Sequence, residues 1–223
     1  MNDATLTVET SGSDPRGRFV HRSTGLLLAL LVSAAAVRGV LIAVWSDNLS
    51  DDRDAYLTIA EGLAAGRGFS VQGSEAPTAF RPPLYPLLLA STGAGGSPLV
   101  RGFLHLLLGT ATVWLTYLLG RRLALGIWLS LFAAALVAFD PLLLRYTTFP
   151  MTSTLATFLT TGLLLSIAFD RSRRQQIVTG LLFGLSVLCR PTTWAFGGLM
   201  VVRWLARRVR FIGGNSENAA APP

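Results

Sequence analysis

Long apolar stretches separated by short polar breaks run along most of this chain. The first stretch, 25–45, contains one charged residue, Arg38. Because about 20 helical residues cross the roughly 30 Å hydrocarbon core of a bilayer, this stretch predicts a transmembrane helix. Further apolar stretches follow at 99–120, 123–139, 149–169 and 177–202. The pattern predicts an all-α fold, a polytopic membrane helix bundle.

The last apolar stretch, 177–202, is interrupted by Arg190 and Pro191. Proline lacks the backbone donor that a helix interior requires, and it pushes the preceding residue out of helical geometry. Two arrangements therefore stay open, one long kinked span or two short ones. With two short spans the chain has about six transmembrane segments.

Arginine placement favours the six-span arrangement, because short cytoplasmic loops of membrane proteins collect positive charge. All 19 basic residues are arginines. With six spans, Arg121, Arg122 and the arginines of 171–174 lie on the same side as both termini. A five-span chain would move the arginines of 203–210 to the opposite side and reverse much of this bias. We therefore predict a multi-pass protein of the plasma (inner) membrane with both termini cytoplasmic.

Composition supports an integral membrane protein. Hydrophobic residues make up 51% of the chain and charged residues 14%, with a mean hydropathy of +0.52, which a soluble domain does not need. The basic pI of about 10.9 does not indicate a nucleic-acid partner, because the cations lie at helix ends rather than on one water-facing surface. A secretory signal cleaved near 33–36 is the alternative for the N-terminus, but apolar sequence continues to Trp45.

The predicted organisation is a membrane domain between two tails. We expect disordered cytoplasmic tails at 1–23 and 209–223, where the sequence is polar or rich in alanine and proline, and a membrane domain at 24–208. The first outer loop, 46–82, holds most of the acidic residues predicted on the outer side. It is the loop with room for a functional site.

Two short juxtamembrane helices are predicted in and after this loop. Asp52 is a suitable N-cap for a helix at 53–65. Apolar residues at helical spacing form one face of that helix, namely Tyr56, Ile59, Ala60, Leu63 and Ala64. Such a helix is expected to lie flat on the membrane surface. Pro82 and Pro83 begin a second short helix that extends to about Ala90.

The charged residues of this region also have ordinary structural explanations. The acids of 51–54 would then cap a helix and solvate a loop. Arg81 would bury its aliphatic stem in lipid and place its guanidinium among headgroups. For Arg38 the cost of an intramembrane charge favours an inward-facing partner, and Asp47 or another first-loop acid is the expected one.

Several short motifs occur in a defined order along residues 25 to 205. They are Arg38 near the end of the first span, Asp52 four residues before Tyr56, the proline-rich segment 77–86, Asp140 and Pro141 at the end of the third span, and the segment 180–191. No single motif is specific, but their order and spacing resemble the N-terminal half of the GT-C superfamily. These are polyprenyl-phosphate-sugar-dependent membrane glycosyltransferases, such as protein O-mannosyltransferase-like enzymes and lipid A aminoarabinose transferases.

The resemblance implies an inverting glycosyltransferase that moves a sugar from a polyprenyl phosphate to an acceptor hydroxyl at the outer membrane face. It assigns the catalytic base to Asp52, with Asp51 as the alternative, although Arg53 stands where the family often has glutamate. A carboxylate within hydrogen-bond reach takes the hydroxyl proton as the new bond forms. The guanidinium groups of Arg81 and Arg190 would neutralise the departing lipid phosphate.

Other residues complete the expected site. We expect four further side chains to contact the substrate, namely Tyr56, Asp54, Tyr85 and Asp140. Neither the two histidines nor the single cysteine, Cys189, indicates a metal site. Asp51, Asp52 and Asp140 offer oxygen ligands suited to Mg²⁺ or Mn²⁺, but we favour transfer without a metal or other cofactor.

Two features depart from the family pattern. The fourth span begins with threonines where the family usually carries an acid, and the shared face of Thr154, Thr157 and Thr161 indicates helix packing rather than a substrate groove. The chain is also about half the usual length, so we hypothesise a half-enzyme, truncated, degenerate or completed by a second membrane subunit. The alternative functions are a non-catalytic subunit and a transporter or flippase for lipid-linked sugars.

Overall fold

The computed structural model of the protein describes residues 15–71, 77–79, 81–169, 172–199, 201, 202 and 205. All regular structure in this part of the chain is helical, as predicted. The α-helices are α1 (Pro15–Val44), α2 (Tyr56–Ala64), α3 (Leu84–Thr92), α4 (Pro98–Arg122), α5 (Ile127–Ala138), α6 (Pro141–Thr147), α7 (Thr152–Ile167) and α8 (Arg173–Cys189). The short 3-10 helices η1 (Ser46–Ser50) and η2 (Pro191–Thr193) also occur, and a further helical segment begins at Trp194.

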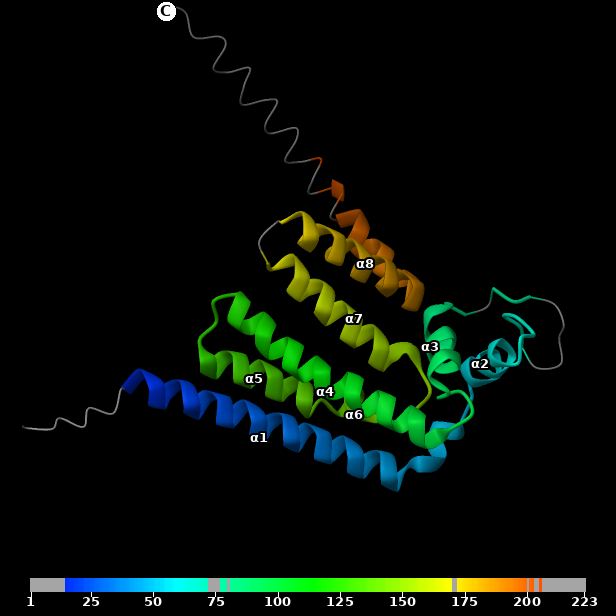
Figure 1. Ribbon diagram of the computed structural model, residues 1–223, viewed down its shortest axis with the longest axis horizontal. Helices are drawn as coiled ribbons and strands as arrows, with labels where there is room; N and C mark the ends of the chain where they lie inside the picture. Colours follow the sequence, from blue (N-terminus) through cyan, green and yellow to red (C-terminus); the bar gives the residue numbers. More distant parts are fainter. Residues whose placement is uncertain are drawn as a thin grey trace, which may run out of the picture.

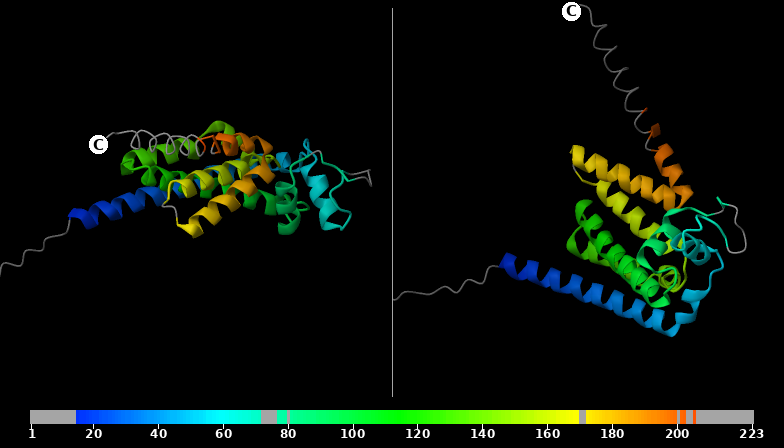
Figure 2. Two further views of the ribbon diagram at one scale, coloured as in Figure 1. Left: turned by 90° about the horizontal axis from the view of Figure 1, so that it is seen from above. Right: turned by 45° about the vertical axis from the view of Figure 1, so that its right-hand side comes forward.

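Helices α1, α4, α5, α7 and α8 lie side by side, and each runs antiparallel to the next one along the chain (Figures 1 and 2). Helix α4 is central, because it packs against α1, α5 and α7, while α8 packs against α7. Helices α2 and α3 lie together at one end of the bundle, beyond the C-terminal end of α1 (Figure 1). They confirm the two short helices predicted at 53–65 and 82–90.

The long helices have the apolar character of membrane spans to different degrees. Within the described residues, two helical stretches are long and apolar enough to cross a bilayer, Ser23–Val44 and Pro98–Arg122. Helices α5 and α6 add a third if they form one span bent by 51°. Helix α7 is apolar but shorter. The structure thus supports two or three of the six predicted spans.

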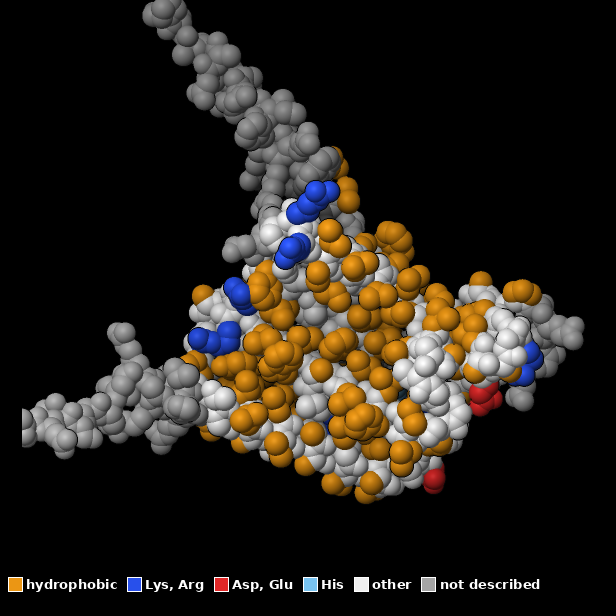
Figure 3. Space-filling model, viewed as in Figure 1, with side chains coloured by type: hydrophobic (Ala, Val, Ile, Leu, Met, Phe, Trp, Pro, Cys, Tyr) orange, Lys and Arg blue, Asp and Glu red, His pale blue; other side chains and the backbone are white. Residues whose placement is uncertain are grey.

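Arginines gather at one end of the bundle, whereas the acidic side chains lie at the other end together with further arginines (Figure 3). Arg121 and Arg122 end α4, and Arg173 and Arg174 begin α8 at the same end, where the guanidinium of Arg122 lies 3.7 Å from the centre of the Phe169 ring. The acids of the first loop lie at the end formed by α2 and α3. This separation is the charge asymmetry from which the topology was predicted.

The chain breaks at Arg190 rather than kinking there. Helix α8 ends at Cys189, Arg190 is extended with φ −147° and ψ 107°, and Pro191 begins η2. The following helical segment turns back along α8, where the Trp194 ring meets the Phe183 ring edge to face at 6.0 Å. The predicted stretch 177–202 therefore consists of two helical segments rather than one kinked helix.

The tail predictions are tested only in part. Helix α1 begins at Pro15, so it includes residues of the segment 1–23 that was expected to be disordered. Residues 1–14, and the predicted C-terminal tail at 209–223, lie outside the described residues.

Arg38 is buried between three helices, with 1% of its surface exposed. Its Nη1 donates to the carbonyl oxygens of Ala34 at 3.2 Å and Ala138 at 3.1 Å, and its Nη2 donates to that of Val137 at 3.3 Å. Ala138 and Val137 end α5, where helix carbonyls lack intrahelical partners and carry partial negative charge. The predicted partner, Asp47 or another first-loop acid, is therefore wrong.

Gly109 of α4 provides the space for the Arg38 side chain. A Cβ atom at position 109 would lie 2.7 Å from Nε and 3.0 Å from Cδ of Arg38. Small residues at helix crossings allow close backbone approach in membrane bundles. Here the glycine admits a guanidinium between α1, α4 and α5.

We predict that Gly109→Ala destabilises the protein by about 1–3 kcal/mol, because the added methyl group displaces Arg38 from the carbonyls of α5. Gly184→Ala on α8 is the matched control, since a Cβ there meets no atom within 4 Å. The midpoint of thermal unfolding in detergent should fall for Gly109→Ala and stay constant or rise for Gly184→Ala. Equal midpoints for the two variants would contradict the role given to Gly109.

Candidate functional site

Asp52 is held at the start of α2 by three hydrogen bonds. Its carboxylate accepts from the backbone N–H groups of Leu57 and Thr58, each at 2.9 Å, and from the Thr58 hydroxyl at 2.8 Å. The chain reaches this geometry through Ala55, whose φ of 59° lies in the left-handed region. The predicted capping role of Asp52 is confirmed, although three residues separate it from the start of the helix.

Arg81 and Asp54 form the ion pair that joins the first loop to the segment before α3. Arg81 Nη2 lies 2.6 Å from Asp54 Oδ1, and Arg81 Nε donates to the Asp54 carbonyl oxygen at 2.9 Å. Each side chain is 25% exposed. The Arg81 guanidinium also lies 5.5 Å from the centre of the Tyr56 ring. The structure thus brings Arg81 into contact with one acid of the first loop, Asp54.

Tyr56 and Tyr85 are both buried, with their rings edge to face and 5.2 Å apart. The Tyr85 hydroxyl lies 2.8 Å from His105 Nε2, and His105 Nδ1 lies 2.9 Å from the Thr147 carbonyl oxygen. Because a carbonyl only accepts, Nδ1 carries the proton, and in the neutral ring the Tyr85 hydroxyl donates to Nε2. Burial raises the pKa of both tyrosines. This chain of hydrogen bonds links α3, α4 and α6.

The apolar face predicted for α2 packs against protein. Tyr56, Ile59 and Ala60 are buried, Leu63 is half-buried, and Ala64 is exposed. The buried cluster that contains this face extends over α3, α7 and the end of α8. The buried residues of this face therefore anchor α2 to the bundle. A helix held only by lipid would not need these contacts with protein.

A cavity of about 300 Å³ lies between the first loop and the turn from α6 to α7. We call it the loop cavity. Its lining contains two carboxylates, two guanidinium groups and a phenol, with the residues Asp51, Arg53, Asp54, Leu142, Arg145, Tyr146, Phe149, Pro150 and Met151. Asp51 Oδ2 pairs with Arg53 Nε at 2.6 Å, and these side chains are 34% and 72% exposed. Such a partly solvated pair is easily exchanged for another partner.

An apolar groove of about 410 Å³ adjoins the loop cavity. It lies between the end of α1 and α6 and is lined by Leu41, Trp45, Asn48, Pro141, Leu144, Arg145, Thr148 and Phe149. Arg145 and Phe149 line both spaces. Within the described part of the chain, Arg145 has no carboxylate within ion-pair distance. The polar loop cavity and the apolar groove thus meet at the Arg145 guanidinium. Two such adjoining spaces are suited to an anionic amphiphile.

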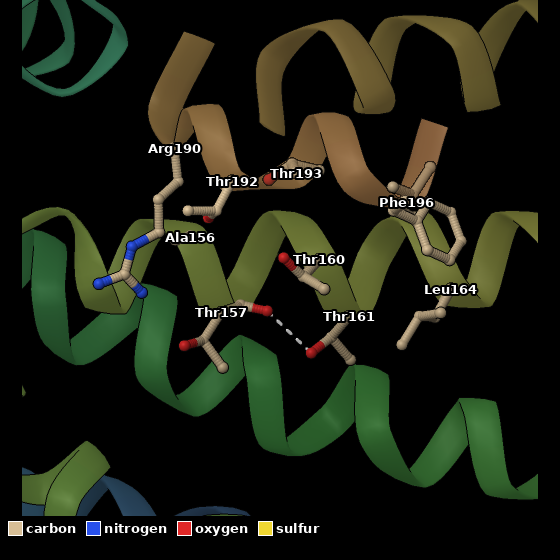
Figure 4. Close-up of a pocket in the computed structure, with 10 residues that line it drawn as sticks. Ala156, Thr157, Thr160, Thr161, Leu164, Arg190, Thr192, Thr193 and Phe196 are labelled. Atoms are coloured by element: carbon tan, nitrogen blue, oxygen red, sulfur yellow. Dashed lines mark hydrogen bonds between the residues drawn. The ribbon is translucent and has the colours of Figure 1, made fainter. Parts of the chain in front are cut away.

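The two other predicted substrate contacts lie elsewhere. Asp140 Oδ1 accepts from the Leu143 N–H at 2.8 Å and caps α6. Arg190 lines a separate cavity between α7 and η2 (Figure 4), and the lining of that cavity does not include Arg81. No group of three or more His, Cys, Asp or Glu residues suited to a metal ion occurs among the residues that the structure describes.

Sequence reasoning missed two residues of this region. His105 looked unconnected because its partners, Tyr85 and Thr147, are 20 and 42 residues away in sequence. Arg145 looked like an ordinary arginine at a helix end. The available signal was Asp140 with Pro141, which begins a short new helix whose last turn carries Arg145. No protein-family model, curated protein or solved structure matches this chain.

We predict that Asp52→Ala loosens α2, because two backbone N–H groups lose their acceptor. The cost should be about 1 kcal/mol, which corresponds to roughly fivefold faster amide exchange in this helix. Hydrogen–deuterium exchange read by mass spectrometry measures it. Asp51→Ala, whose carboxylate pairs with an exposed arginine only, should leave exchange in α2 unchanged; equal effects of both variants would refute the capping assignment.

Proposed function

We propose that the loop cavity and the apolar groove bind a polyprenyl-phosphate-linked sugar, and that the protein transfers this sugar to an acceptor hydroxyl at the outer face of the membrane. The supporting observation is that Arg145 lines both spaces. A lipid phosphate at Arg145 would place its prenyl chain in the groove beside Leu41 and Trp45, and its sugar in the cavity beside Asp51. The motif order that resembles the GT-C superfamily points to the same substrate class.

The proposed reaction needs one base and one anion-binding group. The acceptor oxygen attacks the anomeric carbon from the face opposite the phosphate, and the bond from that carbon to the phosphate oxygen breaks. The hydroxyl proton passes to a carboxylate, the configuration inverts, and the lipid phosphate leaves with its charge compensated by Arg145. Arg81 would position the first loop rather than bind the phosphate, because its guanidinium is already paired with Asp54.

The geometry favours Asp51 over Asp52 as the base. A carboxylate has about four lone-pair sites, and three sites of Asp52 accept hydrogen bonds from α2. Asp51 lines the cavity, and its partner Arg53 is largely exposed. The resemblance assigns the base to Asp52, so the two aspartates are the alternatives that an experiment must separate.

The proposed topology has six spans with the first loop outside. The α5–α6 pair would be one bent span, α7 and α8 two more, and the segment from Trp194 a short sixth. The arginine-rich end of the bundle would face the cytoplasm. A second membrane subunit would supply the remainder of the acceptor site, and it would contact the side of the loop cavity that this chain leaves open.

Arg145→Gln tests the binding half of the proposal. Undecaprenyl phosphate should bind the purified protein, and the variant should weaken binding at least about tenfold because a charge-assisted hydrogen bond is lost. Native mass spectrometry in detergent measures this without knowledge of the sugar. Arg173→Gln, at the opposite end of the bundle, should bind as the wild type does; unchanged binding by Arg145→Gln would exclude the loop cavity as the phosphate site.

Asp51→Asn tests the chemical half. Loss of a general base should lower transfer about 100-fold or more, while undecaprenyl phosphate still binds. The assay follows radiolabel from polyprenyl-phosphate mannose into envelope acceptors by proteoliposomes, with Asp47→Asn as the control. If Asp52→Asn alone abolishes transfer in a folded protein, Asp52 is the base. Binding by the wild type without transfer of any polyprenyl-linked sugar would favour a non-catalytic subunit or a transporter.

A further inference from the structure

A second polar groove lies on the other side of the bundle, between α7 and the segment that follows α8. It measures about 370 Å³ and is lined by Ala156, Thr157, Thr160, Thr161, Leu163, Leu164, Arg190, Thr192, Thr193 and Phe196. We call it the threonine groove. It shares no lining residue with the loop cavity or the apolar groove. The sequence had indicated only helix packing for the α7 threonines.

The threonine groove has a polar end and an apolar end (Figure 4). Arg190, Thr157 and Thr192 lie toward one end, whereas Phe196 and Leu164 lie toward the other. The polar end is at the start of α7, near α2 and α3, which is the outer end in the proposed topology. The apolar end lies deeper in the bundle, where the hydrocarbon of a bilayer would be.

The polar end offers donors to an anion. Arg190 is the one charged residue in the lining. The hydroxyls of Thr157 and Thr161 donate to backbone carbonyls one turn earlier, both at 2.8 Å, so they are held in place. Those of Thr160 and Thr192 make no hydrogen bond within the described residues and stay available as donors. A groove that contains a guanidinium and free hydroxyls is suited to phosphate oxygens.

The apolar end continues into a larger space. A cavity of about 550 Å³ shares Leu163 and Phe196 with the threonine groove and follows α7 toward its C-terminal end. Its apolar lining includes Ile167, Phe183 and Val201. The two spaces together form a path with a cation at the outer end and mainly apolar walls, and the polar side chains of Ser166, Gln175, Gln176 and Thr179 line its far part.

We infer that this path binds one anionic glycerophospholipid of the outer leaflet, with its phosphate at Arg190 and one acyl chain along Leu164 and Phe196. A zwitterionic headgroup fits less well, because no carboxylate lines the groove to pair with its ammonium. This lipid is neither the sugar donor nor the acceptor. It fills the space between α7 and the helical segment from Trp194, so its binding does not depend on glycosyl transfer.

The test is a titration of the purified full chain with phosphatidylglycerol, read by native mass spectrometry. The first phosphatidylglycerol should bind the wild type at least about tenfold more tightly than phosphatidylcholine, and dioleoylglycerol, which lacks phosphate, should not compete. Arg190→Gln should weaken this first binding event at least about tenfold. Arg173→Gln makes the same change of charge at the opposite end of α8, and should leave this first binding event unchanged.

Leu164→Trp provides a second test that keeps the arginine. Leu164 is 40% exposed, so the larger ring is tolerated by the fold and fills the apolar end of the groove. Leu164→Trp should therefore abolish the tight binding of phosphatidylglycerol even though Arg190 is intact. The inference fails if Arg190→Gln and Arg173→Gln weaken binding equally, if phosphatidylcholine binds as tightly, if inorganic phosphate alone displaces the lipid, or if Leu164→Trp binds normally.

Discussion

The buried guanidinium of Arg38, which pairs with no carboxylate among the described residues, holds three helices of the bundle together through carbonyl oxygens. The guanidinium of Arg38 on α1 donates hydrogen bonds to carbonyl oxygens at the end of α5. Helix α4 can pack closely against this side chain because residue 109 is glycine. An unpaired charge at the centre of a transmembrane helix costs about 3 kcal/mol or more. The carbonyls at the end of α5 offset part of that cost, so this contact stabilises the observed crossing of α1, α4 and α5.

The candidate site is built outward from that crossing. The end of α5 leads directly to Asp140, which caps α6, and α6 carries Arg145 to the side of the first loop. The loop itself is fixed by the Asp52 cap and by the Asp54–Arg81 ion pair. Acids and cations therefore face each other across a cavity whose two walls are each anchored to the bundle. The buried contact of Tyr85 with His105 ties α3 to α4 behind that cavity.

Features that depend on neighbouring residues were predictable from the sequence, and features that depend on packing were not. Apolar length predicted α1 and α4, proline predicted the break at Arg190, and an acid before an apolar segment predicted the cap of α2. The partner of Arg38 was not predictable, because carbonyl oxygens at a helix end are the same for every sequence. Arg190 and Arg81 were expected to act together, but the packing of α8 against α7 places Arg190 in a different groove.

The bend of 51° between α5 and α6 has a consequence for depth in the membrane. Helix α6 has 7 residues and is about 10 Å long, so a straight continuation of α5 would carry its end about 4 Å farther along the α5 axis than the bent helix does. Arg145 would then lie farther from Trp45 and from the first loop. The bend instead directs α6 obliquely toward the end of α1 and the first loop, so that Arg145 lines both the loop cavity and the apolar groove. In the proposed topology, this position would put the Arg145 guanidinium within the headgroup layer, where a lipid phosphate could reach it.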